Sequence, residues 1–240
     1  MYFKIVKLKN VTSTNNYAYK LAQGGQREIT CVVAKSQSKG KGRMGRKWVS
    51  KSGKGIYVSF IFRPDVGLEK VNLLSIAIAL AAVKALNHII PLKIKWPNDV
   101  IVGNKKIGGV LLEACSGAKY PLFVIAGLGL NVNSGIKDMP RGATSLFLET
   151  KRKYEIDKIF KRIVKEVIIL YKDFKRGYYK VIVEEAADYI DTLARKVSVD
   201  TGRKKIKGVA YRIGKYGALY IKDDRGRRKK ILASEIVHCR

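Results

Sequence analysis

One segment, residues 69–88, has the sequence EKVNLLSIAIALAAVKALNH and is apolar on nearly every face of a helix. Because it has no polar stripe to leave in water, this segment predicts a helix buried against a sheet. Its longest apolar run, residues 76–83, is far too short to span a bilayer. The N-terminal residues MYFKIVKLKN also lack the apolar stretch of a signal peptide. We therefore expect a cytoplasmic protein with no membrane association.

Strand-forming segments precede and follow this helix. A short helix at residues 17–23 is expected between N-cap candidates at Ser13–Asn16 and the Gly24-Gly25 pair. A longer helix at 156–174 has apolar residues at three- and four-residue spacing, with Lys and Arg on the other face. The expected strands are residues 2–8, 29–35, 55–63, 92–96, 106–114 and 121–131. We predict an α/β (α+β) domain at residues 1–190, with a mixed sheet and packing helices.

The pattern changes after residue 190. Short β-prone segments separated by glycine turns follow one another at residues 196–200, 205–213, 217–222 and 228–232. They predict a small, barrel-like β domain at residues 191–240.

The composition limits the possible partners and chemistries. The 240 residues include 49 Lys and Arg against 19 Asp and Glu, a formal net charge of +30. This charge attracts nucleic acid, nucleotide phosphates or an acidic protein, without choosing among them. Cys31, Cys115 and Cys239 have no metal-ligand spacing, so no metal site is expected. His88 and His238 are the only histidines and give little support to a histidine-activated nucleophile.

A basic, glycine-rich loop is the most informative stretch. Gly40, Gly42 and Gly45 alternate with cations, and no acid occurs between residues 29 and 64. Glycines let the backbone approach an anion, and arginine offers a planar fork to phosphate or carboxylate. The spacing is not that of a Walker A loop. Solvated surface loops are also rich in lysine, so composition alone leaves both readings open. The cations are Lys35, Lys39, Lys41, Arg43, Arg46, Lys47, Lys51 and Lys54.

Three further segments carry candidate chemistry. In Lys95-Trp96-Pro97-Asn98-Asp99, the proline turns the chain and exposes Asp99, which could accept from an amine, hold Mg²⁺ or cap the turn. Lys106 stands beside glycines, where it could reach a ligand or remain a solvated strand end. The stretch at residues 127–133 ends a strand with asparagines that could meet a ligand at the sheet edge.

These segments, taken in order, resemble the biotin–protein ligase family over nearly the whole chain. Ser13-Thr14-Asn15 resembles its STN motif, and residues 40–48, GKGRMGRKW, resemble its GRGRxGRxW loop. Residues 95–99 reproduce KWPND, and Lys106-Ile107-Gly108-Gly109 with Glu113 resembles the next strand motif. Residues 127–133 and 143–146 resemble GxGxNVN and ATSL. Lys41 and Met44 depart from the pattern, since arginines are common at both positions.

The resemblance implies a catalytic domain related to class II synthetases, followed by an SH3-like barrel. It implies a ligase that forms biotinyl-5′-AMP from biotin and Mg²⁺-ATP, then transfers biotin to a lysine of an acidic biotin carboxyl carrier protein. We expect no DNA-binding domain before the first strand, and therefore a monofunctional ligase. A homodimer and no specific nucleic-acid partner are expected as well.

The resemblance also assigns roles to residues. The implied catalytic residues are Arg43, Lys106 and Asp99. The implied biotin-binding residues are Ser13, Thr14, Asn15, Gln37, Gly40, Lys41, Arg43, Lys106 and Gly109. The implied ATP-binding residues are Arg43, Arg46, Trp48, Lys95, Asn98, Lys106 and Asn131.

Two other functions fit parts of the sequence. Lipoate or octanoate ligases are similar in fold, but the contiguous GRxGRxW loop and KWPND argue against them. A nucleic-acid-binding module would suit residues 192–240, where Lys and Arg far outnumber Asp and Glu.

Overall fold

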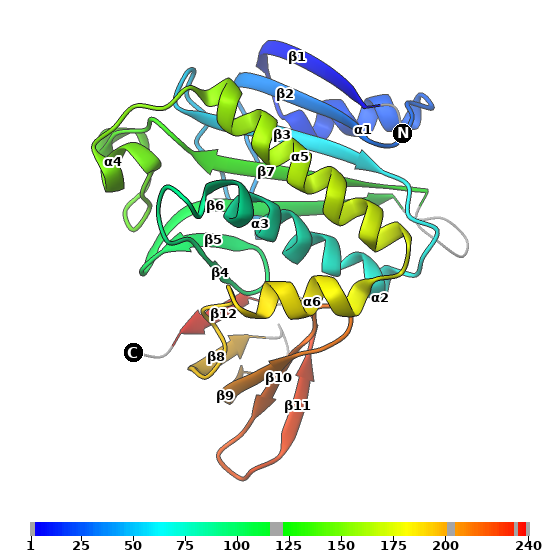
Figure 1. The fold of residues 1–240 in the computed structure, drawn as a ribbon, viewed down its shortest axis with the longest axis vertical. Helices are drawn as coiled ribbons and strands as arrows, with labels where there is room; N and C mark the ends of the chain where they lie inside the picture. The colour runs from blue at the N-terminus through cyan, green and yellow to red at the C-terminus, as the bar shows by residue number, and fades with distance from the viewer. Residues whose placement is uncertain (1–2, 116–121, 201–204, 233–234, 239–240) are drawn as a thin grey trace.

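A large mixed sheet forms the body of the protein (Figure 1). The computed structural model describes residues 3–115, 122–200, 205–232 and 235–238. The strand order is β1-β2-β3-β7-β6-β5-β4, in which β1 pairs parallel with β2 and the other neighbours are antiparallel. The strands are β1 Lys4–Val11, β2 Thr30–Gln37, β3 Gly55–Phe62, β4 Lys93–Lys95, β5 Asp99–Val102, β6 Lys105–Cys115 and β7 Phe123–Asn131.

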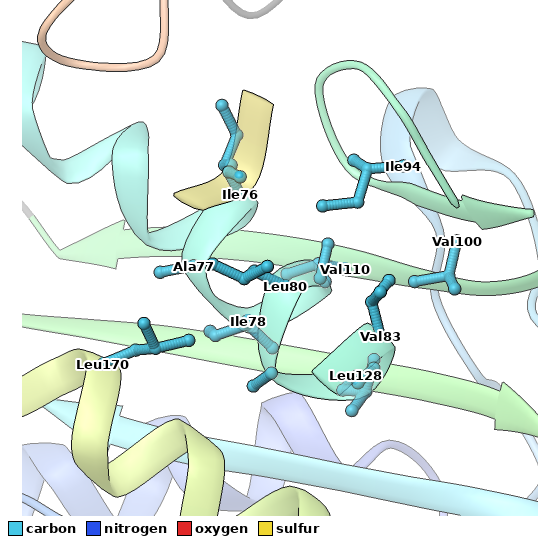
Figure 2. Close-up of a cluster of buried hydrophobic side chains, with 14 of the residues drawn as sticks. Ile76, Ala77, Ile78, Leu80, Val83, Ile94, Val100, Val110, Leu128 and Leu170 are labelled. Carbon is cyan, nitrogen blue, oxygen red and sulfur yellow. The ribbon is translucent and has the colours of Figure 1, made fainter. Parts of the chain in front are cut away.

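Helices cover the two faces of this sheet differently. Helices α3 (Leu73–Leu86) and α5 (Ile156–Lys175) lie on one face, and α1 (Thr14–Gln23) lies on the other (Figure 1). Alternation along β7 places Val124 in the core of the α3 face and Ile125 in the core beneath α1. Figure 2 shows α3 side chains, including Leu80 and Val83, packed against strand residues such as Val110.

The buried and amphipathic helices agree with their sequence patterns. The segment predicted at 69–88 divides into α2 (Leu68–Val71) and α3, and the expected burial on nearly every face is found in α3. The helix predicted at 156–174 is confirmed as α5. The helix predicted at 17–23 begins earlier, at Thr14, because the Ser13 hydroxyl caps it by accepting from the Asn16 N–H at 3.5 Å.

Several short elements were not predicted. Strand β5 (Asp99–Val102) has four residues and begins at the last residue of KWPND, so its own pattern is too short to detect. The same applies to the five-residue helix α4 (Leu146–Thr150). Helix α6 (Tyr179–Ala187) was also missed.

A second, antiparallel sheet follows α6, below the main sheet in Figure 1. Its order is β11-β10-β9-β8-β12. Strands β8 and β9 occupy the predicted residues, β10 is shorter than predicted, and β12 was not predicted. The strands are β8 Lys196–Asp200, β9 Lys205–Ile213, β10 Leu219–Lys222, β11 Arg228–Ile231 and β12 Glu235–His238.

Trp96 joins this second sheet to the first. Its indole N–H donates to the Gly217 carbonyl at 2.7 Å, and its backbone N–H donates to the Thr192 hydroxyl at 3.0 Å. These two hydrogen bonds of Trp96 therefore attach the turn that carries Pro97, Asn98 and Asp99 to the C-terminal part of the chain.

The structure describes the side chains of two of the three cysteines and of one of the two histidines. Cys31 and Cys115 are free, and burial raises the pKa of Cys31 to about 12. His88 contacts Arg162 on α5. Cys239 and the His238 side chain lie outside the described residues. Residues 2 and 121, the first residues of two predicted strands, lie outside them as well. In the described part of the chain, no helix has the length and apolarity needed to span a membrane.

Candidate functional site

A pocket of about 510 Å³ opens on the α1 face of the main sheet. Three glycines on adjacent strands, Gly109, Gly127 and Gly129, form part of its floor. A Cβ at Gly127 would overlap the Asn15 amide oxygen, and a Cβ at Gly129 would overlap the Trp48 indole. The hollow therefore exists because these positions have no side chain, which lets Asn15 and Trp48 approach the sheet closely.

Polar side chains build one end of the pocket at the N-terminus of α1. The Thr14 backbone N–H donates to the Gln37 amide oxygen at 2.7 Å, and the Gln37 amide nitrogen donates to the Ser50 hydroxyl at 2.8 Å. The Asn15 amide nitrogen donates to Glu113 at 2.7 Å. Ser13, Thr14 and Asn15 are all buried. This end offers fixed, neutral hydrogen-bonding groups to a ligand.

The basic loop builds the opposite end. It contains a 3₁₀ turn at Arg43–Gly45, with Met44 in the left-handed region at φ 53°. The Arg43 guanidinium donates to the Asn98 amide oxygen at 3.1 Å. Burial lowers the pKa of Arg43 from its ordinary value, and the Asp99 carboxylate opposes that shift. Arg43 nevertheless stays charged at neutral pH, because guanidinium does not lose its proton in proteins.

Lys106 and Trp48 also line the pocket, and Asp99, the ion-pair partner of Lys106, interacts with Arg43 as well. The Lys106 ammonium lies 2.6 Å from the Asp99 carboxylate and 5.6 Å from the centre of the Trp48 ring. The Trp48 indole N–H is buried and has no hydrogen-bond partner among the described residues. A buried donor without a partner is costly, so a ligand acceptor placed here would gain a hydrogen bond that the protein alone does not make.

Nearly all the predicted site residues line this one pocket. Gly40 is the exception: it is buried against the Trp48 carbonyl and the Ser50 hydroxyl, where a Cβ would not fit. Asp99, predicted to be exposed by the turn, is half-buried at the start of β5. The predicted residues that line the pocket are Ser13, Thr14, Asn15, Gln37, Lys41, Arg43, Arg46, Trp48, Lys95, Asn98, Asp99, Lys106, Gly109 and Asn131.

The sequence analysis assigned no role to one part of the pocket wall. Met139, Pro140 and Ala143 line the pocket there. Ala143 is the first residue of the ATSL motif, to which the sequence analysis gave no role, and Met139 and Pro140 precede that motif. Asp138 precedes this wall and lies 3.0 Å from the Lys51 ammonium and 3.5 Å from that of Lys54, joining it to the end of the basic loop.

Comparison with known proteins decides the family. Residues 7–131 match the model of the biotin/lipoate A/B protein ligase family. The chain belongs to this family. It is 32% identical to the bifunctional ligase/repressor BirA of Bacillus subtilis, over 94% of this chain and 71% of that protein. It is 27% identical to the biotin–[acetyl-CoA-carboxylase] ligase of Mycobacterium tuberculosis, over 92% of this chain and 83% of the relative.

A solved structure agrees with this assignment. The biotin protein ligase from Aquifex aeolicus in complex with biotin and ATP superposes with a TM-score of 0.85 at 30% identity. The match covers 99% of this chain and all of that one. These relatives place the chain with the biotin ligases, so it is an enzyme.

The Asp138 contacts predict a pH-dependent stability of the enzyme. The Gly135 backbone N–H and the Lys51 ammonium lower the pKa of Asp138 from 3.8 to about 2. A lowered carboxyl pKa stabilises the fold above the unfolded value, and this contribution disappears as the pH falls through the folded value. We expect Asp138→Asn to lower the urea midpoint by a constant amount above pH about 5, with the difference shrinking between pH about 4 and about 2. A difference that is independent of pH across this range would contradict the assignment.

Proposed function

We propose that this enzyme activates biotin with ATP and transfers it to a lysine of an acidic carrier domain. One observation supports this most strongly: a single pocket has fixed amide and hydroxyl groups at one end and Arg43 with Lys106 at the other. The neutral end suits the ureido ring of biotin, and the cationic end suits a carboxylate next to a phosphate. The Aquifex relative, described with both biotin and ATP, supports the same pair of ligands.

The first step must bring two anions together. The biotin carboxylate oxygen attacks the α-phosphorus of Mg²⁺-ATP, and the bond from that phosphorus to pyrophosphate breaks. Lys106 and Arg43 reduce the repulsion between the reacting anions and stabilise the charge that develops. Trp48 and Asn131 would contact the adenine side. Mg²⁺ enters as part of the nucleotide; no group of three or more His, Cys, Asp or Glu residues that could hold a metal occurs in the described residues.

The second step forms the amide. The carrier lysine attacks the biotinyl carbonyl carbon, its C–N bond forms, and the C–O bond to phosphate breaks to release AMP. The amine must lose a proton, and Asp99 is the carboxylate that we assign to orient or deprotonate it. The basic loop would exclude water from the mixed anhydride meanwhile.

The net charge of +30 supports an acidic carrier protein as the partner. We further propose that the chain divides into a catalytic domain at 1–190, related to class II synthetases, and an SH3-like domain at 191–240. The two separate sheets support this division. A homodimer and a cytoplasmic location stay predictions, as does the absence of a specific nucleic-acid partner.

ATP–pyrophosphate exchange tests the first step. We expect exchange that depends on biotin and does not occur with lipoate, since lipoate has no ureido N–H groups to satisfy the polar end of the pocket. Exchange with lipoate alone would assign the enzyme to the other branch of its family. No exchange with either acid from a folded, Mg²⁺-supplied protein would contradict the proposal.

Lys106→Ala should block adenylate formation. Loss of one cation that stabilises the reacting anions should lower the exchange rate by about 10²–10³-fold. The matched control is Lys105→Ala, which removes the neighbouring ammonium, an exposed group paired with Glu149 at 3.0 Å outside the pocket. Exchange at the wild-type rate in Lys106→Ala would show that the charge of Lys106 is not needed.

Arg43→Ala should leave a folded protein that releases biotinyl-5′-AMP faster, because the loop loses the guanidinium that we assign to the phosphate. Retention of labelled adenylate after rapid gel filtration measures this release. Lys39→Ala, an exposed cation of the same loop that does not line the pocket, is the control. Equal release rates for Arg43→Ala and wild type would remove Arg43 from this role.

A further inference from the structure

The second sheet has one face in the core and one face turned to solvent. Val197 and Val199 on β8, and Leu219 and Ile221 on β10, are buried in the core. Because side chains alternate along a strand, the positions between these residues are directed away from the core. We refer to the solvent-facing surface of β8, β9, β10 and β11 as the outer face. It extends away from the main sheet at one end of the molecule (Figure 1).

The outer face carries cations without acidic partners. Asp200, at the end of β8, is the one acid described on this face. Other acids of this part of the chain bind cations elsewhere: Asp191 lies 2.5 Å from Arg195, and Asp223 lies 2.9 Å from Arg227. None of the outer-face cations forms an ion pair in the described part of the chain. These cations are Lys196, Lys207, Arg212, Lys222, Arg228 and Lys230.

Two of these cations lie directly opposite each other on neighbouring strands. Lys222 on β10 is in register with Arg228 on β11, and both side chains are exposed. Like charges in such a pair repel and destabilise the sheet. A row of anions placed along β10 and β11 would remove this repulsion. The arrangement therefore favours a ligand with repeated negative charges.

Aromatic groups lie among the cations. Tyr211 is 39% exposed and is the extra residue of a bulge, since Ala210 pairs with Ile221 and Arg212 with Tyr220. The bulge exposes two consecutive side chains, those of Tyr211 and Arg212. The ring centres of Tyr211 and Tyr220 are 6.3 Å apart, and the Arg212 guanidinium lies 4.4 Å from the centre of the Tyr220 ring.

These flat groups indicate what kind of polyanion fits. Unpaired bases stack on exposed aromatic rings and on guanidinium planes, and their phosphates bind lysine and arginine. An acidic protein would account for the cations but not for an exposed ring beside a guanidinium that is itself stacked on a ring. The bases of a duplex are already stacked on one another, so a single strand makes better use of Tyr211 and Arg212.

We propose that the outer face binds single-stranded RNA, with phosphates on its cations and bases on Tyr211 and Arg212. Phosphates and base faces are common to all sequences, so this binding has no sequence preference. It agrees with the prediction that no specific nucleic-acid partner exists. The binding is separate from ligation, because no residue after Ala143 lines the pocket.

Fluorescence anisotropy of the full chain with a labelled RNA of about 16 nucleotides and mixed sequence tests the proposal. We expect log K to fall linearly with log salt concentration, with a slope of roughly −3 for about four phosphate contacts. The same RNA annealed to its complement should bind about tenfold more weakly, and polyglutamate, which has charges but no bases, should compete poorly. Equal binding of the duplex, or equal competition by polyglutamate, overturns the inference.

Tyr211→Ala tests the stacking contribution. Loss of one stacked base should weaken RNA binding about tenfold, whereas Tyr211→Phe, which keeps the ring, should bind as wild type does. The matched control is Tyr178→Ala, which removes a tyrosine that is 52% exposed next to α6. Binding by Tyr211→Ala that equals wild type removes the aromatic contact and overturns the inference.

The double variant Lys222→Ala/Lys230→Ala tests the phosphate contacts. It should reduce the salt slope by about 1.4, at about 0.7 for each lost contact. Its unfolding midpoint should not fall, because the repulsion with Arg228 is relieved. The matched control is Lys161→Ala/Lys165→Ala, which removes two exposed cations of α5.

An equal loss of slope in both double variants would assign the binding to net charge and overturn the inference. So would unchanged RNA binding by Lys222→Ala/Lys230→Ala together with slower biotin transfer to an acidic carrier, since the face would then serve a protein.

Discussion

The close approach of Asn15 and Trp48 to bare backbone on β7 is the constraint on which the rest of the site depends. Gly127 and Gly129 lie on one face of that strand, two residues apart, and each is covered by one of these side chains. On the other face of the same strand, Leu128 and Leu130 are buried in the main core (Figure 2 shows Leu128). The two-residue period of a strand thus places a filled core and a hollow pocket back to back. Because α3 and its neighbours hold β7 from the core side, the floor of the pocket has little freedom to move.

Gln37 links the two chemically different ends of the pocket. Its amide group contacts Thr14 at the neutral end and Ser50 at the close of the basic loop, and the Ser50 hydroxyl in turn donates to the Trp48 carbonyl at 3.3 Å. Thr14 and Gln37 are not neighbours in the sequence: Thr14 begins α1, and Gln37 ends β2, the next element along the chain. The parallel pairing of β1 with β2 brings them together, because it aligns Val11 with Gln37 at the ends of both strands.

Sequence patterns predicted the elements whose signal extends over many residues. The α3 segment and α5 have long, unambiguous patterns, and β8 and β9 are bounded by clear turns. Short elements such as β5 and α4 have too few residues to show a period, and their position depends on contacts made elsewhere. The site residues were found through motif resemblance rather than through periodicity. Met139 and Pro140 were missed because nothing in their own sequence indicates that they line a pocket whose other residues come from distant parts of the chain.

The loop between β2 and β3 shows why net charge alone says little about function. Its first residues are fixed to the β1 end, where the Ser38 and Lys39 backbone N–H groups donate to Val11 and Thr12 at 3.0 and 2.8 Å. Its last residues are fixed through Gln37, Ser50 and the Lys54 carbonyl, which accepts from Val132 at 3.0 Å and from Asn133 at 2.8 Å. Only the middle of the loop, which carries Arg43, remains away from these anchors. Many cations of this chain are solvated and screened within a Debye length of about 8–10 Å, whereas Arg43 is half-buried beside Asn98. Placement of one guanidinium by its anchored loop therefore matters more for the chemistry than the total of +30.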